Sequence, residues 1–204
     1  MSLYQKHRPK TLKGMVGQDA AVASLSKLIE RDHVPHALLL TGPSGSGKTT
    51  IGRALKSVLV CGDADYTEIN SADFKGIDMV RDLRRQVTLS PISGDSRIWL
   101  IDEAHKLTSD AQNALLKLLE DTPSHAYFML ATTDPQKLIK TIHTRCTEVK
   151  LSAVSAAACA GGARLSTITP TSGDRFFVSG YHPYWAGDAW QSYPWDALDE
   201  VYFF

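Results

Sequence analysis

The feature that most constrains the fold is a glycine-rich loop between an apolar run and a helix-forming segment. It has the pattern GxxxxGKT and consists of Gly42, Pro43, Ser44, Gly45, Ser46, Gly47, Lys48 and Thr49. Its glycines let backbone N–H groups turn toward phosphate oxygens, and a helix N-terminus adds positive potential. Lys48 is placed to reach the β- and γ-phosphates, and Thr49 offers a hydroxyl ligand to Mg²⁺. We therefore predict an ATP and Mg²⁺ site, and we include the next residue, Thr50, in it.

Short apolar runs alternate with amphipathic segments along the first 152 residues, which is typical of βαβ units. Strands are predicted at 37–41, 66–70, 97–102, 127–132 and 148–151, and helices at 22–29, 48–60, 77–87, 109–121 and 138–142. Strands joined in this way run parallel and are covered by helices on both faces. The expected fold is α/β, with a five-stranded parallel sheet between two layers of helices.

Two adjacent carboxylates, Asp102 and Glu103, stand at the end of the apolar strand 97–102. Neighbouring side chains on a strand point to opposite faces, so the two acids cannot share one task. We expect Asp102 to belong to the Mg²⁺ shell and Glu103 to orient and polarise the attacking water. Strands often end in acids where they meet solvent, but the pairing with the loop at 42–49 favours the functional interpretation.

Three further positions have a structural and a functional interpretation. Thr133 ends the strand 127–132, which we place between the strands that lead to the loop and to Glu103. There it either senses the γ-phosphate or caps the strand. Arg145 follows a short helix and is either solvated or an arginine finger that reaches the nucleotide of a neighbouring subunit. We interpret His105 as structural, because a single histidine after the acids has many ordinary explanations.

The charge and cysteine content exclude several classes of protein. Lys and Arg total 22 and Asp and Glu total 22, which excludes a uniformly basic coat for nucleic acid. No apolar run is long enough to cross a membrane, and the N-terminal residues do not form a secretory signal. Cys61, Cys146 and Cys159 form no CxxC pair, so we expect no zinc site and no disulfide framework. A cytoplasmic location fits these features.

Residues 1–152 resemble the AAA+ ATPase subunits of DNA-polymerase clamp loaders. The resemblance rests on segments 4–12, 16–18, 42–49, 102–105, 114–120, 130–138 and 144–146. Segment 130–138 is similar to the sensor-1 segment of bacterial gamma/tau subunits, and Thr144-Arg145-Cys146 to the family's Ser-Arg-Cys motif. The chain lacks the four-cysteine zinc module of most gamma/tau subunits after Cys61. In this it resembles phage-type subunits and small subunits of the replication factor C kind.

The resemblance implies an Mg²⁺-dependent ATPase that works in a ring with other clamp-loader subunits. Such a ring opens a sliding clamp and loads it onto primer–template DNA. The resemblance places Val16 and Gly17 at the adenine, and it favours Arg145 acting in trans. It also favours contact between DNA and a basic stripe that consists of Lys75, Arg81, Arg84 and Arg85. The alternative is that these residues form a solvated helix face.

Two other functions stay open at this point. One is a different AAA+ DNA motor, such as a Holliday-junction branch-migration helicase, which has the same two Walker motifs. The other is a scaffold subunit that binds nucleotide with little turnover.

The composition changes near residue 152, which divides the expected ATPase domain at 1–152 from a segment at 153–204. Residues 1–152 carry 20 Lys and Arg against 17 Asp and Glu, while 153–204 carry 2 against 5. The second segment begins as an Ala-, Ser- and Gly-rich linker and continues as an aromatic-rich tail. It is too short for the helical lid and collar of the family, so we assign no sensor-2 role to Arg164. The tail either packs on the ATPase domain, binds a partner, or has no evolved role.

Overall fold

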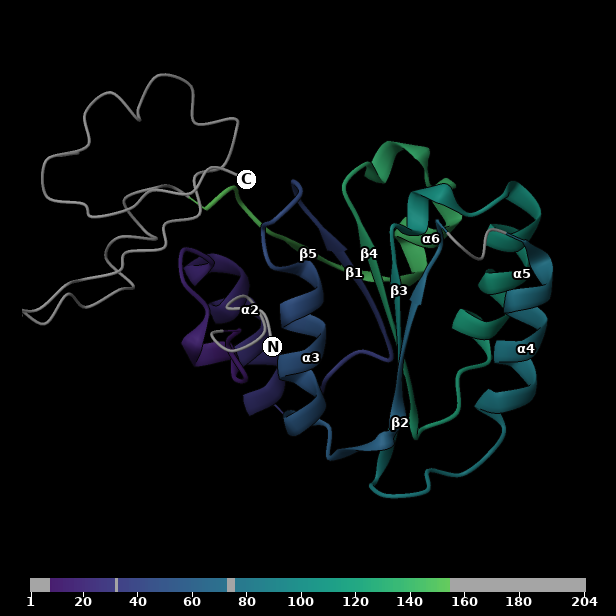
Figure 1. Ribbon diagram of the computed structural model, residues 1–204, viewed down its shortest axis with the longest axis horizontal. Coiled ribbons are helices and arrows are strands. Elements are labelled where there is room, and N and C mark those ends of the chain that lie inside the picture. Colours follow the sequence, from purple (N-terminus) through teal and green to yellow (C-terminus); the bar gives the residue numbers. More distant parts are fainter. Residues whose placement is uncertain (1–7, 32, 73–75, 155–204) are drawn as a thin grey trace, which may run out of the picture. The chain divides into compact units, whose positions relative to one another are not determined.

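The computed structural model describes residues 8–31, 33–72 and 76–154, and the linker and tail at 155–204 lie outside the described residues. Five parallel strands form one sheet in the order β2-β3-β4-β1-β5 (Figure 1). The strands are β1 Ala37–Thr41, β2 Cys61–Asn70, β3 Ser96–Asp102, β4 Ala126–Thr132 and β5 Thr147–Lys150. The predicted five-stranded parallel sheet is confirmed. The predicted division of the chain near residue 152 stays a prediction.

Helices cover both faces of this sheet (Figure 1). The α-helices are α2 Asp19–Glu30, α3 Lys48–Val58, α4 Ile77–Val87, α5 Ser109–Glu120 and α6 Lys140–Arg145. Short 3-10 helices are η1 Leu12–Gly14, η2 Ala104–Lys106 and η3 Pro135–Lys137. In Figure 1, α2 and α3 lie on one side of the sheet, and α4, α5 and α6 lie on the other. None of the helices in the described ranges is long and apolar enough to cross a membrane.

Alternate residues of the central strands feed two separate hydrophobic cores. On β3, Leu100 packs in the core with α2 and α3, whereas Trp99 and Ile101 pack in the core with α4, α5 and α6. On β4, Phe128 stacks on Trp99 with ring centroids 5.2 Å apart. Because successive side chains point to opposite faces, a strand buried on both sides needs apolar residues on both faces, with few polar exceptions such as Arg97 on β3 and Thr132 on β4. This requirement explains why the apolar runs could be recognised as strands.

Several elements begin at other residues than the sequence predicts, among them β2 and α6. The strand expected at 66–70 begins at Cys61, with an irregular register between Cys61 and Tyr66. The helix expected at 138–142 spans Lys140–Arg145, because Ile139 is extended and its N–H donates to Oε1 of Gln112 at 2.9 Å. The helix also ends later than expected, so that Arg145 is its last residue. The prediction that Arg145 follows the helix is therefore wrong.

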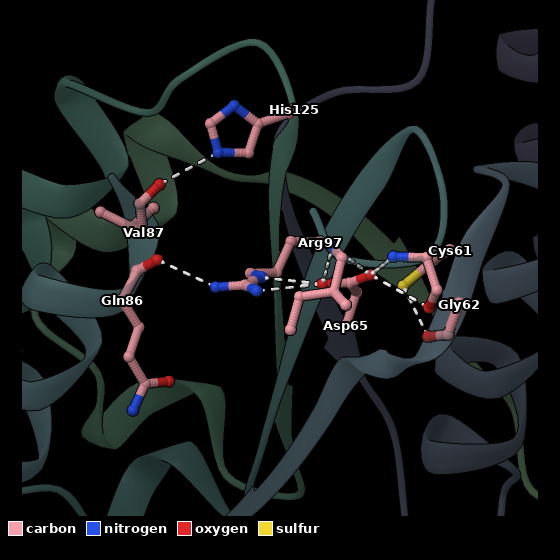
Figure 2. A network of polar contacts seen from close by, with 9 residues as sticks. Cys61, Gly62, Asp65, Gln86, Val87, Arg97 and His125 are labelled. Atoms are coloured by element: carbon pink, nitrogen blue, oxygen red, sulfur yellow. Dashed lines mark hydrogen bonds and ion pairs between the residues drawn. The ribbon is translucent and has the colours of Figure 1, made fainter. Parts of the chain in front are cut away.

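A buried ion pair joins β2 to β3 at the sheet edge opposite the glycine-rich loop. Arg97 donates to Oδ1 of Asp65 through Nη2 at 3.0 Å and through Nε at 3.2 Å. Its Nη1 donates to the carbonyl of Gln86 at 3.2 Å, so that the guanidinium lies between β2 and the end of α4 (Figure 2). Asp65 also accepts from the N–H groups of Ile92 and Ser93. The network therefore fixes β2 against the turn that leads into β3.

Candidate functional site

The predicted site residues come together at the carboxyl edge of the sheet. The glycine-rich loop follows β1, Asp102 ends β3, and Thr132 ends β4. Since β4 lies between β1 and β3, the loop and the two acids flank the end of β4. Ligands of open parallel sheets bind at this edge, outside the carboxyl ends of the strands.

The backbone of the loop needs glycine at several positions. Gly42, Gly45 and Gly47 have φ of 153°, 73° and 95°, in the region that side chains disfavour. A Cβ on Gly42 would lie 2.5 Å from the carbonyl oxygen of Leu151. The Oγ of Ser46 is buried and has no hydrogen-bond partner, which leaves a polar atom available inside the loop. These features fit a cradle for a phosphate chain.

Lys48 begins α3 and folds back over the loop. Its Nζ donates to the carbonyl oxygens of Gly42 at 2.8 Å and Pro43 at 2.7 Å. Burial lowers the pKa of Lys48, and the negative charges of Asp102 and Glu103 oppose that shift. The two acids are therefore close enough to act on the ammonium group. A phosphate chain in the loop would replace the two carbonyls as the partner of Nζ.

Asp102 and Thr49 are the residues that fit Mg²⁺. Thr49 is half-buried on the first turn of α3, whereas Thr50 is buried. Asp102 accepts from the N–H of Glu103 at 2.9 Å through Oδ1. Burial raises the pKa of Asp102, and the neighbouring Glu103 charge adds to the shift. A cation beside Asp102 would favour its ionised form, and carboxylate and hydroxyl oxygens are hard ligands of the kind Mg²⁺ prefers.

Glu103 has an unusual backbone conformation, and its carboxylate lies beside an ammonium group and an imidazole ring. Its φ is 54°, in the left-handed region, where few residues other than glycine are found. Its Oε2 lies 3.3 Å from Nζ of Lys106 and 3.4 Å from Nε2 of His105. The other ring nitrogen of His105 is 2.9 Å from Oγ1 of the fully buried Thr132. His105 thus connects the carboxylate of Glu103 to the end of β4.

The threonine that contacts this cluster is Thr132, and the role of Thr133 at the γ-phosphate stays a prediction. Thr133 directly follows β4 and is half-buried. Thr132 accepts from the N–H of Asp134 at 3.1 Å and faces His105. The alternation of side chains on β4 decides which of the two threonines points toward Glu103, and two adjacent threonines gave no sequence signal for that choice.

The residues predicted to contact the adenine directly precede α2 in the sequence and lie beside the loop. Val16 is 39% exposed, and Gly17 has φ of 72°. The next residue, Gln18, is buried and donates to the carbonyl of Ser46 in the loop. Gln18 belongs to the segment 16–18 that carries the resemblance, but the resemblance implied no individual role for its side chain.

Arg145 and the basic stripe lie on the face covered by α4, α5 and α6. Arg145 donates to Glu120 and to the carbonyl of Thr141, which are its polar partners among the described residues. Two residues of the stripe are paired on their own helix, Arg81 with Asp78 and Arg85 with Asp82.

Arg84 lines a shallow hollow between α4 and α5, together with Lys117 and Asp110. Lys75 lies outside the described residues.

Within residues 8–31, 33–72 and 76–154, no three His, Cys, Asp or Glu side chains are grouped to hold a metal ion. Cys61 and Cys146 are buried free thiols, and Cys159 lies outside the described ranges. The expectation of no zinc stays a prediction. A magnesium site made by one carboxylate, one hydroxyl and the phosphates themselves needs no such group.

Comparison with known sequences relates the chain to bacterial replication proteins. Residues 64–155 match the family model described as DNA polymerase III, delta subunit. DNA polymerase III subunit gamma/tau of Mycobacterium tuberculosis is 34% identical over 71% of this chain. Subunit tau of Escherichia coli is 36% identical over 74% of it. The chain spans only 29% and 27% of these two relatives.

Solved structures share the fold. A gamma subunit-related protein from Thermotoga maritima has a TM-score of 0.56 at 24% identity and covers 64% of this chain and 45% of its own. The Holliday-junction branch-migration motor RuvB of the same organism has a TM-score of 0.56 at 25% identity, over 72% of this chain and 48% of its own. The chain therefore carries a clamp-loader segment of the DNA polymerase III gamma/tau kind, built on an AAA+ P-loop fold.

Proposed function

We propose that this chain is the ATP-binding and ATP-hydrolysing part of a DNA-replication clamp loader. The observation that supports this most is the meeting of the glycine-rich loop, Lys48 and the acids Asp102 and Glu103 at one edge of the sheet. The arrangement occurs in a chain that is 34–36% identical to gamma/tau relatives over most of its length. A lone glycine-rich loop would support nucleotide binding without indicating the process it serves.

In this proposal, different residues of the chain have separate roles in the transfer of the phosphoryl group to water. Backbone N–H groups of the loop and Lys48 hold the phosphate chain, while Thr49 and Asp102 hold Mg²⁺. When bound, Mg²⁺ neutralises part of the phosphate charge. Glu103 orients and polarises the attacking water, for which it must turn away from Lys106 and His105. Catalysis of this kind is mostly positioning and charge stabilisation, so the loss of any one group is costly.

Arg145 completes the site of a neighbouring subunit in this proposal. It carries the positive charge that the γ-phosphate needs, and it lies at the exposed end of α6. To act in trans, it must exchange Glu120 for the neighbour's nucleotide. Thr133 and Thr132 then report the state of the γ-phosphate from the end of β4.

The partners follow from the same proposal. Other clamp-loader subunits form the ring, which opens a sliding clamp and holds primer–template DNA in the cytoplasm. Arg84, which forms no ion pair with the described acids of its own helix, is the member of the basic stripe best placed to contact a DNA phosphate. Arg81 and Arg85 can do so only by leaving Asp78 and Asp82. Contacts of this kind position the DNA without reading its sequence.

The direct test compares Glu103→Gln with the wild-type chain in ATP binding and in turnover. The amide keeps the size of the side chain but cannot polarise water, so turnover should fall about 100-fold or more while the Kd for ATP stays within about threefold. Lys48→Ala should weaken binding itself. Glu30→Gln, at the exposed end of α2, is the matched control and should change neither quantity. Near-normal turnover in Glu103→Gln would remove Glu103 from the mechanism.

A branch-migration motor is the second candidate, because the RuvB structure shares this fold. The two functions differ in the DNA that stimulates hydrolysis. A clamp loader responds to primer–template DNA with a clamp, and a branch-migration motor responds to a four-way junction. A scaffold subunit would bind ATP and respond to neither.

A further inference from the structure

The side chain of Gln18 connects the glycine-rich loop to the chain that follows β5. It is 2% exposed. Its Nε2 donates to the carbonyl of Ser46 at 3.0 Å and to that of Ser152 at 2.7 Å, and its Oε1 accepts from the N–H of Ser152 at 3.1 Å. Both amide hydrogens and the carbonyl oxygen are therefore engaged. Its Oε1 also lies 3.5 Å from Oγ of Ser152. A buried group that bonds the backbone of two segments fixes those segments relative to each other.

Both segments that Gln18 joins lie against the phosphate-binding loop. Ser46 is inside the loop, just before Gly47, the N-cap of α3. On the other side, the N–H of Leu151 donates to the carbonyl of Thr41 at 2.7 Å, and the carbonyl of Leu151 fills the space beside Gly42. A change in the loop at Ser46 must therefore be transmitted to Ser152 or break the contacts of Gln18.

We propose that Gln18 is a positioning residue that couples the conformation of the loop at Ser46 to the position of the chain at Ser152, and so sets the affinity for nucleotide. This inference rests on the proposed function, because it takes the loop as the nucleotide site. Gln18 acts through the backbone of Ser46. Coupling between two sites is reciprocal, so bound nucleotide must stabilise the contact with Ser152 as much as that contact stabilises bound nucleotide.

The substitution Gln18→Glu cuts this connection at one end. The carboxylate keeps the length of the side chain and an oxygen that accepts from the N–H of Ser152. It loses both donated bonds, including the one to Ser46. The matched control is Gln112→Glu. Gln112 is 4% exposed, donates to the carbonyl of Leu107 at 3.1 Å and accepts from Ile139, away from the loop. Both variants place a new carboxylate among buried carbonyls, so a general loss of stability affects both.

Two readouts separate positioning from simple support of the fold. For Gln18→Glu, the Kd for ATP should rise about tenfold, which is about the net contribution of one hydrogen bond. For Gln112→Glu, the Kd should stay within about twofold of the wild-type value. Hydrogen exchange at the amide of Ser152 should slow when ATP and Mg²⁺ are added to the wild type and to Gln112→Glu. In Gln18→Glu the amide should remain protected without nucleotide but show no further slowing with it.

A second pair of variants applies if Gln18→Glu does not fold. Ser152→Pro removes the N–H whose hydrogen bond Oε1 of Gln18 accepts. Ser152→Ala keeps that N–H and loses only the longer contacts of Oγ, 3.3 Å to the carbonyl of Gly17 and 3.5 Å to Oε1 of Gln18. The proline variant should weaken ATP binding several-fold, and the alanine variant should not. Unchanged affinity in the folded Gln18 and proline variants, together with lost binding in Lys48→Ala, would overturn the role of Gln18 alone. A wild-type chain that does not bind ATP would overturn the proposed function and this inference with it.

Discussion

At the scale of single residues, the environment of the site disfavours the ionised forms of two of its side chains. Asp102 is half-buried, its pKa is raised by burial and by Glu103, and the pKa of Lys48 is lowered by burial. Neither shift favours the charged form that the chemistry needs. Bound Mg²⁺ and phosphate supply the opposite charges, so the site is complete only when they are present. Functional sites commonly carry such unfavourable charges at a cost in stability.

This leads to a prediction for Asp102→Asn without nucleotide or Mg²⁺. A raised carboxyl pKa means that the folded chain holds the proton more tightly than the unfolded chain. The stabilisation is therefore present below about pH 4 and is lost as the pH rises through the folded pKa. Asp102→Asn should then have a higher Tm than the wild type at pH 7. It should also bind Mg²⁺ and ATP more weakly.

Thermal unfolding at pH 7 and pH 4 checks this expectation, with the exposed Asp95→Asn as the control. The difference in Tm between Asp102→Asn and the wild type should shrink at the lower pH. A Tm of Asp102→Asn at or below that of the wild type at pH 7 would contradict the account.

The residues that could be predicted are those whose partners lie within a short motif. Lys48, Thr49, Asp102 and Glu103 stand in local patterns with a chemical meaning, and the structure brings them to one edge. Gln18, Thr132 and Glu120 could not be predicted, because their partners lie 134, 27 and 25 residues away. Such contacts depend on strand order and on the side chain's face, which the motifs do not specify.

At the scale of elements, the ion pair between Asp65 and Arg97 fixes β2 at the edge of the sheet. Burial would raise the pKa of Asp65, but hydrogen bonds from Ile92 and Ser93 and the Arg97 guanidinium hold it below its usual value. Asp65 accepts bonds from a loop and from β3, and Arg97 reaches the end of α4 (Figure 2). One carboxylate thus orders three elements.

We predict that Asp65→Asn lowers the free energy of unfolding by about 3–5 kcal/mol at pH 7, because it leaves Arg97 buried without its counter-ion. The pKa of Asp65 is depressed, so the stability it contributes is present above about pH 4 and is lost as the pH falls through its folded pKa. The difference between variant and wild type should therefore narrow in acid.

Urea unfolding at pH 7 and pH 3 measures both effects. The matched control is Asp63→Asn, two residues earlier, where an exposed carboxylate pairs with Lys56. That variant should leave the urea midpoint almost unchanged. An equal loss in the two variants would show that the buried pair does not stabilise β2.

The same strand shows why an element boundary was missed. The first half of β2 contains Gly62, Asp63 and Asp65, residues that strands disfavour. Pairing with β3 and the buried ion pair override that local preference, so the strand begins at Cys61 and not at Tyr66. In contrast, β1, β3 and β4 are buried on both faces, and their continuous apolar runs made them predictable.

At the scale of the whole molecule, the two cores protect the thiols of the described residues. Burial raises the pKa of Cys146 to about 12 and also raises the pKa of Cys61. Since the thiolate is the reactive form, neither residue should react with an alkylating reagent at pH 8 while the domain is folded.

This expectation is checked in a Cys159→Ser variant, so that the two described cysteines are the only thiols present. Mass spectrometry after brief alkylation should find both thiols unmodified in buffer and both modified in denaturant. Rapid modification of Cys146 in buffer would show that the packing around α6 is open.

Whether the domain works in a clamp loader is tested most directly by steady-state ATP hydrolysis. The rate per chain is measured over a series of protein concentrations, with primer–template DNA and a sliding clamp, with a four-way junction, and with neither. The account predicts a rate that rises with concentration and increases with DNA and clamp, and that falls when Arg145→Ala is mixed in. A rate that stays flat and near zero in all conditions, or that responds to the junction alone, would contradict it.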